Sequence, residues 1–236
     1  MKMYRSSPSG FTLVEMAIVL VIIGLLLGGM LMPLSAQMDQ RRISETQKTL
    51  DEINQALIGF AVINGYLPCP AISSSSGAED RTGTTCTGGK RVGFVPWATL
   101  GVSQTDSWGR LFRYSVTATF TDSGTKPTLG TTGDITLNDN FAAAIATSVP
   151  AVVMSHGING YFATLAGGAA AIANGSATNT DEGTNADVGV PVPGTIFVSK
   201  NITSNTGAPG GDFDDIVSWL SPNILFNRMV AAGKLP

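Results

Sequence analysis

The sequence predicts an α+β fold in which one long amino-terminal helix, with a membrane half and an amphipathic half, packs on an antiparallel β-sheet head. Residues 11–32 form an almost unbroken apolar run, and an apolar stripe at helical spacing continues from Ile43 to Phe60. Beyond Gly65, short apolar segments alternate with Gly, Pro, Ser and Thr, which is typical of strands and turns. A sheet packed on one helix gives the α+β class.

Composition bounds the class of protein. A chain of 236 residues fits one anchored domain of ordinary size. Only 13% of its residues are charged, it holds 28 glycines, and its second half is rich in Ser, Thr, Ala and Asn. This composition indicates a loop-rich exported domain rather than a helical cytosolic enzyme. The net charge of −3, without clusters of Lys and Arg, predicts no nucleic-acid partner.

The apolar run has the length of a membrane-spanning helix. From Phe11 to Met32 its only charged residue is Glu15. Lys2 and Arg5 precede the run, which favours a cytoplasmic amino end and an exported carboxyl-terminal domain. The alternative is a secretory signal peptide, but its apolar region is usually about 7–15 residues and ends at a small-residue cleavage site. This run is longer, and no convincing A-x-A site follows it.

Glu15 is the one ionisable residue in this apolar run. A carboxylate in a membrane interior costs a few kcal/mol, so its presence indicates a function. A positive group in the same apolar layer would compensate it. A free α-amino group made by cutting the chain nearby is the simplest source of that charge.

Lys2, Arg5, Gly10 and the stretch FTLVE that follows, together with the apolar helix, resemble the amino-terminal signature of type IV prepilins and type II secretion pseudopilins. The resemblance implies that prepilin peptidase cuts after Gly10 and that the new amino group of Phe11 is N-methylated. It also implies that Glu15 pairs with that amino group, in its own chain or a neighbour, as subunits pack into a filament. An unpaired charge in a dry bundle is costly, so this pair would also set the axial register.

The resemblance divides the chain into four segments. These are a leader peptide (1–10), a transmembrane and filament-core helix (11–32), an amphipathic stalk helix (33–65) and a periplasmic globular head (66–236). In the stalk, apolar residues recur every seven positions from Ile43 to Leu57. Pro33 either kinks the helix or separates two helical halves. The helix is expected to end near Asn64 and Gly65.

Alternation predicts strands in the head. Around residue 113, one strand face carries Leu111, Arg113 and Ser115, and the other carries Phe112, Tyr114 and Val116. Further strands are expected at 151–155 and 195–199. Several short head motifs, among them Leu-Pro-Cys-Pro and Asp-x-Trp-Gly, also resemble pseudopilin and minor-pilin heads.

Two further head segments have distinct patterns. Residues 163–211 are rich in Gly, Ala, Thr and Asn, and we expect them to form a mobile excursion with little core. Ser221 and Pro222 read as an N-cap and first helical position, opening a short helix that stops near Gly233. This helix should pack back on the head through Ile224, Leu225 and Met229.

The cysteines, Cys69 and Cys86, lie 17 positions apart in a polar stretch. With one histidine in the chain, a zinc site has too few ligands of the usual kinds. An even pair in an exported domain most simply forms a disulfide, which would stabilise the fold by roughly 3 kcal/mol. The alternative is two free thiols.

Acidic residues near the carboxyl end form the candidate metal site. Asp212, Asp214 and Asp215 follow two glycines and could hold calcium. Major pseudopilins are similar in having an acidic calcium loop followed by Trp, and the resemblance carries calcium over to these three residues. This chain differs by continuing for 17 residues beyond Trp219. The alternative is an acidic helix amino terminus without an ion. No other cofactor is expected.

No catalytic constellation stands out. His156 could act as a base, alone or with Cys69 as a thiol nucleophile, but the chain has no G-x-S-x-G elbow. A structural or surface histidine is the favoured interpretation. We therefore expect a protein that is not an enzyme.

The favoured function is a structural subunit, a pseudopilin or minor pilin, anchored in the bacterial inner membrane with its head in the periplasm and then assembled into a periplasmic or surface filament. Its expected partners are prepilin peptidase, other pilin or pseudopilin subunits, an inner-membrane assembly platform and membrane lipid. One alternative is a binding module at a pilus tip, for adhesion or DNA uptake, with residues 163–211 as its contact surface. Another is a membrane-tethered enzyme.

Overall fold

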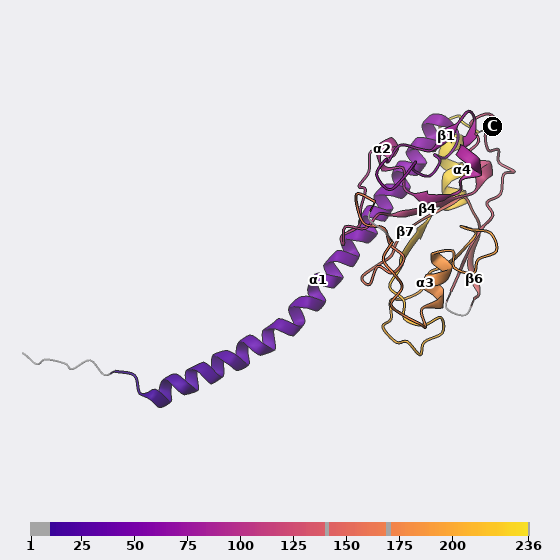
Figure 1. The fold of residues 1–236 in the computed structure, drawn as a ribbon. Coiled ribbons are helices and arrows are strands. Elements are labelled where there is room, and N and C mark those ends of the chain that lie inside the picture. Colours follow the sequence, from indigo (N-terminus) through magenta and orange to yellow (C-terminus); the bar gives the residue numbers. More distant parts are fainter. Residues whose placement is uncertain (1–9, 140–141, 169–170, 236) are drawn as a thin grey trace, which may run out of the picture. The chain divides into compact units, whose positions relative to one another are not determined.

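The computed structural model describes residues 10–139, 142–168 and 171–235, apart from the side chains of residues 27–34 (Figure 1). The chain forms two compact units, Met1–Arg41 and Arg42–Pro236. Of the predicted leader, only Gly10 lies within the described residues.

One helix, α1, spans Leu13–Asn64 and is 52 residues long. The helix does not stop at Pro33, so the alternative of two separate helices is wrong. Gly65 ends it with a φ of 86°, and its N–H donates to the carbonyl of Ala61 at 2.7 Å. Glycine adopts this left-handed conformation without a steric penalty. The predicted end of the helix is confirmed.

The head contains two main sheets and a hairpin. A four-stranded antiparallel sheet has the order β3 (Val92–Phe94), β4 (Arg113–Val116), β7 (Ala151–Ser155) and β9 (Ile216–Trp219). A three-stranded sheet has β5 (Ile135–Asn138) between β6 (Ala144–Val149) and β8 (Ile196–Val198), and β1 (Arg81–Thr82) pairs with β2 (Thr85–Cys86). The helices of the head are α2 (Trp97–Leu100), α3 (Thr180–Asn185) and α4 (Pro222–Ala231). The α+β class is confirmed.

The expectation of a wholly antiparallel sheet is wrong for one pair of strands. β8 runs parallel to β5, with Leu137 opposite Phe197. A parallel pair requires a long crossover connection, and here β6, β7 and α3 intervene along the chain. The segment predicted at 195–199 is therefore a strand, but it belongs to a mixed sheet.

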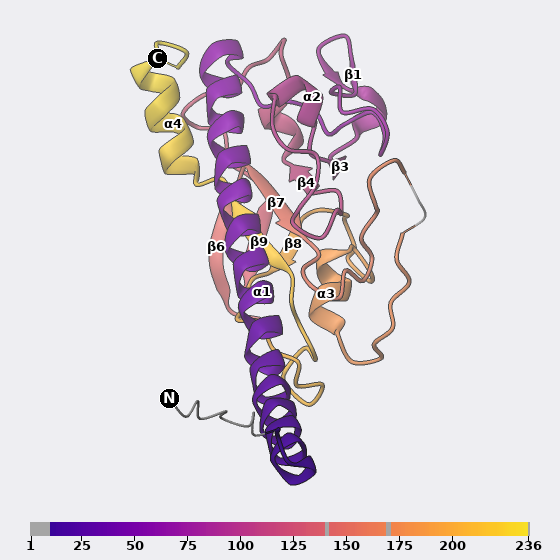
Figure 2. The same cartoon turned by 90° about the vertical axis from the view of Figure 1, so that its left-hand side faces the viewer.

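Strand β7 lies at the centre of the packing, and all five of its residues are buried. Ala151 and Val153 belong to one apolar cluster with α1, whereas Val152 and Met154 belong to a second cluster with β5 and β8. Because side chains alternate along a strand, β7 serves both cores. The head thus has α1 and α4 on one side of the four-stranded sheet and the three-stranded sheet on the other (Figure 2).

The helix-side core confirms the predicted faces of β4 and the predicted stripe of α1 except for Phe60, which is only half-buried. Its α1 members are Leu50, Ile53, Leu57, Ile58 and Ala61, and it also contains Phe112, Tyr114 and Val116. The Asn54 side chain donates to Ser218 Oγ of β9 at 2.7 Å. These contacts fix the carboxyl-terminal part of α1 to the sheet.

The carboxyl-terminal helix α4 is confirmed, with Ser221 at its N-cap position and Pro222 first. Leu225 and Met229 are fully buried against the α1 core, and α4 lies beside α1 (Figure 2). Ile224, predicted on the same face, is instead 53% exposed. Adjacent helical residues point about 100° apart, so Ile224 turns away when Leu225 packs inward.

Residues 163–211 contribute few apolar residues to the core, as predicted, but they contain more regular structure than the sequence indicated. This segment contains α3 and β8, and Phe197 of β8 is buried between the sheets. Asn185 of α3 donates to the Val198 carbonyl at 3.1 Å and accepts from the Val198 N–H at 2.7 Å. Polar side chains thus bond to the backbone where apolar packing is sparse, which a composition rich in Asn and Thr does not reveal.

Candidate functional site

The bond between Gly10 and Phe11 lies in a non-helical stretch immediately before α1. Phe11 is 83% exposed, and a Cβ placed on Gly10 would meet no atom within 4 Å. A protease needs an accessible bond outside regular structure, and the exposure of this non-helical stretch meets that need. Lys2 and Arg5, the predicted basic flank, lie outside the described residues.

Thr12 and Glu15 form a capping box at the start of α1. The Thr12 N–H and hydroxyl both donate to Glu15 Oε2 at 2.9 Å, and the Glu15 N–H donates to Thr12 Oγ1 at 3.2 Å. Such a box satisfies backbone donors that a helix start leaves unpaired. Glu15 therefore has a local structural role that the sequence interpretation overlooked, although the T-x-x-E spacing signals it.

The described side chains between residues 11 and 26 are all exposed. The large apolar ones are Phe11, Leu13, Val14, Met16, Ile18, Val19, Leu20, Val21, Ile22, Ile23, Leu25 and Leu26. A soluble monomer rarely exposes a continuous apolar surface of this extent, so this part of α1 requires an apolar partner or surroundings.

The predicted membrane-spanning segment, 11–32, is described only in part, because the side chains of residues 27–32 lie outside the described set. Within the part of the chain that is described, no helix combines the length and the hydropathy needed to cross a membrane.

The predicted disulfide between Cys69 and Cys86 is present, with Cα atoms 5.5 Å apart. Both cysteines are buried, and the Cys69 N–H donates to Glu79 Oε2 at 3.1 Å. The alternative of two free thiols is therefore wrong, and so is a thiol nucleophile at Cys69. The bond closes the loop that contains the β1–β2 hairpin.

Asp212 lies apart from the other two predicted calcium ligands. Its Oδ1 accepts hydrogen bonds from Ser176 Oγ at 2.6 Å and Thr178 Oγ1 at 3.0 Å. These bonds, the Ser176 bond above all, lower the pKa of Asp212. Asp212 thus fastens the loop around residue 176 to the segment before β9.

Asp214 and Asp215 are buried together with Glu182 of α3, and one carboxylate oxygen of each lies within 4.8 Å of the others. Glu182 Oε1 accepts from the Asp214 N–H at 2.8 Å, and Glu182 Oε2 accepts from Asn179 Nδ2 at 2.6 Å. Asp214 Oδ2 accepts from the Asn159 N–H at 2.7 Å. The structure therefore joins two of the predicted acids to a third that the sequence analysis did not single out.

Burial and mutual repulsion disfavour ionisation in this cluster. Burial chiefly, with the neighbouring Glu182 and Asp215 charges, raises the pKa of Asp214 to about 8, against a hydrogen bond from Asn159. Burial, and then the Asp215 charge, raises the pKa of Glu182. The alternative of an acidic helix amino terminus is wrong, because strand β9 follows Asp215 directly.

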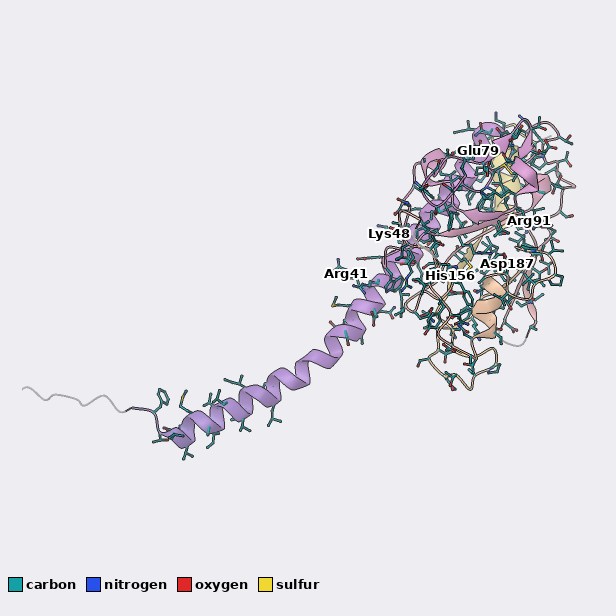
Figure 3. All side chains as sticks on the ribbon, viewed as in Figure 1. Arg41, Lys48, Glu79, Arg91, His156 and Asp187 are labelled. Atoms are coloured by element: carbon teal, nitrogen blue, oxygen red, sulfur yellow. A yellow bond between two sulfur atoms is a disulfide. The ribbon has the colours of Figure 1, made fainter. Side chains whose placement is uncertain are left out.

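His156 is 3% exposed and lies within the head (Figure 3), so its placement is structural rather than superficial. Its Nδ1 is 3.5 Å from Asp215 Oδ1 and has no hydrogen-bond partner. The hydroxyl of the adjacent Ser155 donates to Asp106 Oδ2 at 2.6 Å. His156 therefore borders the acidic cluster rather than a nucleophile.

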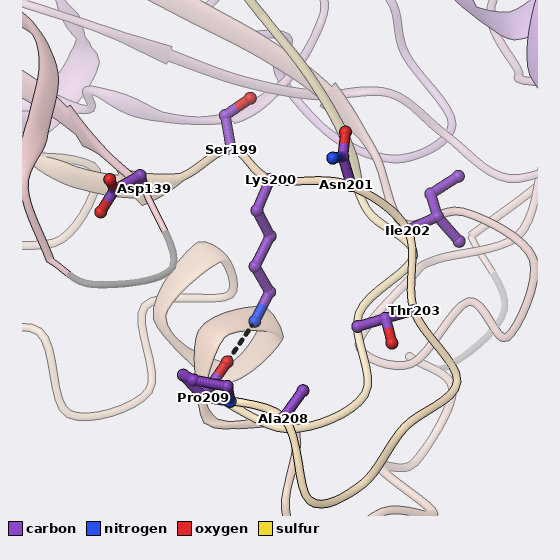
Figure 4. Close-up of a pocket in the computed structure, with 8 residues that line it drawn as sticks. All are labelled: Asp139, Ser199, Lys200, Asn201, Ile202, Thr203, Ala208 and Pro209. Atoms are coloured by element: carbon purple, nitrogen blue, oxygen red, sulfur yellow. Dashed lines mark hydrogen bonds between the residues drawn. The ribbon is translucent and has the colours of Figure 1, made fainter.

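A surface cavity of about 540 Å³ lies between the end of β8 and the loop at Pro209 (Figure 4). Lys200 reaches into it and donates to Asp181 Oδ2 at 2.5 Å and to the Pro209 carbonyl at 2.7 Å. Asn201 and Thr203 also line the cavity. Its walls can offer hydrogen bonds to a small polar ligand.

Residues 5–31 match the family described as the prokaryotic N-terminal methylation motif, the signature of type IV pilins and pseudopilins. The resemblance drawn from Gly10 and the FTLVE stretch is therefore confirmed for this segment. No curated protein and no solved structure matches the chain. The motif indicates a processed structural subunit that assembles with other pilins, rather than an enzyme.

Proposed function

We propose that this protein is a pseudopilin or minor pilin, a structural subunit of a type II secretion or type IV pilus filament. Prepilin peptidase cleaves it after Gly10, Phe11 is N-methylated, and the inner membrane holds residues 11–32 until the subunit enters the filament. The head resides in the periplasm. The observation that carries this proposal is the methylation motif at residues 5–31, at the start of an apolar helix.

The geometry at the start of α1 supports processing and packing. The Gly10–Phe11 bond is exposed and non-helical, as a peptidase substrate should be. The apolar side chains that follow are exposed on all sides, which suits a helix surrounded by lipid or by other subunits. In both environments these side chains are removed from water.

The capping box supports the pairing of Glu15 with the amino group that cleavage would create. Its carboxylate already accepts the backbone N–H of Thr12, which follows Phe11 directly in the chain. The new amino group of Phe11 thus arises one residue from an existing contact. Pairing within the chain needs little rearrangement, and pairing with a neighbour exchanges the cap for a charge–charge contact.

Because Glu15 has two roles, substitution by alanine would remove both. Glu15→Gln is the sharper variant, since glutamine can serve in a capping box but carries no charge. We expect Glu15→Gln to be processed normally and to lose most of its incorporation into filaments, measured by immunoblotting of sheared filaments and membranes.

Thr12→Ala is the matched control, since it removes the capping hydroxyl and leaves the carboxylate. We expect Thr12→Ala to retain more incorporation than Glu15→Gln. Wild-type incorporation of Glu15→Gln would refute the charge-based docking role. Equal loss in both variants would mean that incorporation depends on the cap as much as on the charge.

A binding module at a pilus tip is the second candidate, favoured by the cavity at Lys200 within the excursion of residues 163–211. Its partner would be a host surface or transforming DNA. Asn201 lines the cavity and is exposed. If Asn201→Ala abolished adhesion or DNA uptake while incorporation stayed at the wild-type level, this function would be supported; unchanged adhesion and uptake would count against it.

A further inference from the structure

The side of α1 that points away from the sheet carries opposite charges in the head unit. Leu50, Ile53 and Leu57 are buried in the helix-side core, whereas Lys48 and Glu52 are exposed (Figure 3). With 3.6 residues per turn, positions 48 and 52 lie on one side of the helix, opposite the buried stripe and about 6 Å apart along the axis. This side of the helix is open to a partner.

Lys48 and Glu52 are not paired within the chain. Their spacing of four residues would allow an ion pair, but among the residues that the structure describes neither takes part in one. An intrahelical pair is more favourable when the acid precedes the base, and here the base comes first. Both charges can therefore pair with a group outside the chain.

A second copy of the chain is complementary to this side of the helix. In a parallel neighbour displaced along the axis by four residues, or about 6 Å, Lys48 lies at the level of Glu52 of the first subunit. Each subunit then gives its acid to one neighbour and its base to another. Without a displacement, like charges would lie at the same level and repel.

The same displacement is required at the start of α1. The proposed docking contact with a neighbour joins Glu15 to the amino group of Phe11, and there too the acid follows the base by four residues. The helix continues without interruption from Leu13 to Asn64. One axial displacement between neighbours therefore suits a contact in the apolar part of the helix and another in its polar part.

We propose that Glu52 of one subunit pairs with Lys48 of a second copy of this chain, displaced by four residues along α1. This contact rests on the proposed assembly into a filament, and it adds a polar contact that fixes the displacement between subunits. The pair lies in the part of α1 that packs on the head, outside the apolar run. Because water surrounds it before assembly, salt should weaken this contact.

Charge reversal in the full chain tests the pair. We expect Lys48→Glu and Glu52→Lys each to lower incorporation into sheared filaments by roughly tenfold, since an attraction becomes a repulsion at every contact. The matched control is Lys234→Glu, an equally large change of charge at an exposed residue outside α1, and it should incorporate like wild type. The Tm of each variant in detergent should stay within about 2 °C of wild type, because all three residues are exposed.

Co-expression of Lys48→Glu with Glu52→Lys separates a contact between subunits from one within a helix. Each variant alone carries two like charges at positions 48 and 52, but each supplies the charge that the other lacks. We expect the two together to incorporate to within about twofold of wild type.

Absence of this mutual rescue would overturn the proposal, and so would wild-type incorporation of either variant expressed alone. A wild-type chain that enters no filament would refute the proposed function, and this contact with it.

Cysteine cross-linking measures the displacement directly. The two native cysteines, Cys69 and Cys86, are buried and bonded to each other, so they do not compete. Differently tagged Lys48→Cys and Glu52→Cys chains should form a mixed dimer on oxidation of filaments, since a disulfide requires Cα atoms within about 7 Å.

Lys48→Cys with Gln55→Cys is the matched control, because Gln55 is also exposed and lies about 4.5 Å further along the helix than Glu52. This control pair should cross-link less than the pair at 48 and 52. Preferential cross-linking of the control pair would overturn the displacement of four residues.

Discussion

The two units of the chain differ in the exposure of their apolar side chains. In Met1–Arg41, Leu20 is 65% exposed and Leu25 is 72% exposed, although both lie in a regular helix. In Arg42–Pro236, Leu50 and Leu57 of the same helix are 1% and 0% exposed. One helix thus begins with a surface that needs external partners and ends in a core that the chain completes itself.

This contrast separates assembly from folding. Burial of a leucine contributes roughly 1.5–3 kcal/mol wherever it occurs. In the head that contribution stabilises the monomer, whereas in the amino-terminal unit it becomes available only on insertion or assembly. Substitutions in the two units should therefore affect different measurements.

The largest expected effect comes from a matched pair of leucines. Leu57→Ala should destabilise the head by about 2–5 kcal/mol, because it opens a cavity between α1 and the sheet. Leu20→Ala should change the stability of the detergent-solubilised monomer by less than about 0.5 kcal/mol. Urea unfolding followed by tryptophan fluorescence measures both values.

The same pair should reverse its order in filaments. Leu20→Ala should lower incorporation, since the lost contact lies between subunits, although the head remains folded. Equal unfolding free energies for the two variants would contradict the contrast between the units.

Removal of the disulfide should come next. The variant Cys69→Ala/Cys86→Ala loses a link across 17 positions, and the expected cost is roughly 3 kcal/mol. For a chain of this size the Tm should fall by about 6–12 °C. Calorimetry of the head transition measures this fall. Incorporation at a temperature well below the new Tm should remain, because the bond lies far along the sequence from residues 11–32.

The smallest expected effect concerns the ion pair between Arg91 and Asp134. The two guanidinium nitrogens of Arg91 donate to the two oxygens of Asp134 at 2.6 and 2.7 Å, joining the segments that precede β3 and β5. Partial burial disfavours ionisation, but the bonds from Arg91 and Thr117 outweigh it and lower the pKa of Asp134. Its carboxyl group is therefore easier to ionise in the folded chain than in the unfolded chain.

Because the pKa of Asp134 is lower in the folded chain, its ionised carboxylate stabilises the fold above the unfolded pKa of about 3.9. This stabilisation is lost as the pH falls through the folded pKa. The Asp134 side chain is 48% exposed, so we expect Asp134→Asn to cost at most about 1 kcal/mol at pH 7. The difference from wild type should vanish in acid. A difference that persists at pH 2 would assign the effect to shape rather than charge.

Periodic features of the sequence predicted much of the fold. The stripe from Ile43 to Leu57 predicted the buried face of α1, and Gly65 predicted its end. The alternation around Tyr114 predicted which side chains of β4 share a face, and the face with Phe112, Tyr114 and Val116 meets the helix. In these segments one local period determines which side chains are buried.

Contacts between distant segments were not predictable in this way. Glu182 and Asp214 are 32 positions apart, yet the Asp214 N–H donates to Glu182 Oε1 at 2.8 Å. Asp212 looked equivalent to Asp214, yet a hydrogen bond to Ser176 draws it elsewhere. No single-sequence period encodes such a junction.

The start of α1 is an intermediate case. The T-x-x-E spacing of Thr12 and Glu15 predicts a capping box. Because the carboxylate lies in an apolar run, however, the sequence interpretation gave Glu15 only a docking role. A local structural role and an assembly role are compatible at this residue, and Glu15→Gln separates them.

Intact-mass and amino-terminal peptide mass spectrometry of the native protein tests the central claim most directly, because assembly through α1 depends on the new amino terminus. The account predicts a chain that starts at Phe11, with a methylated amino group. A chain that retains residues 1–10, or that starts at any other residue, would contradict it.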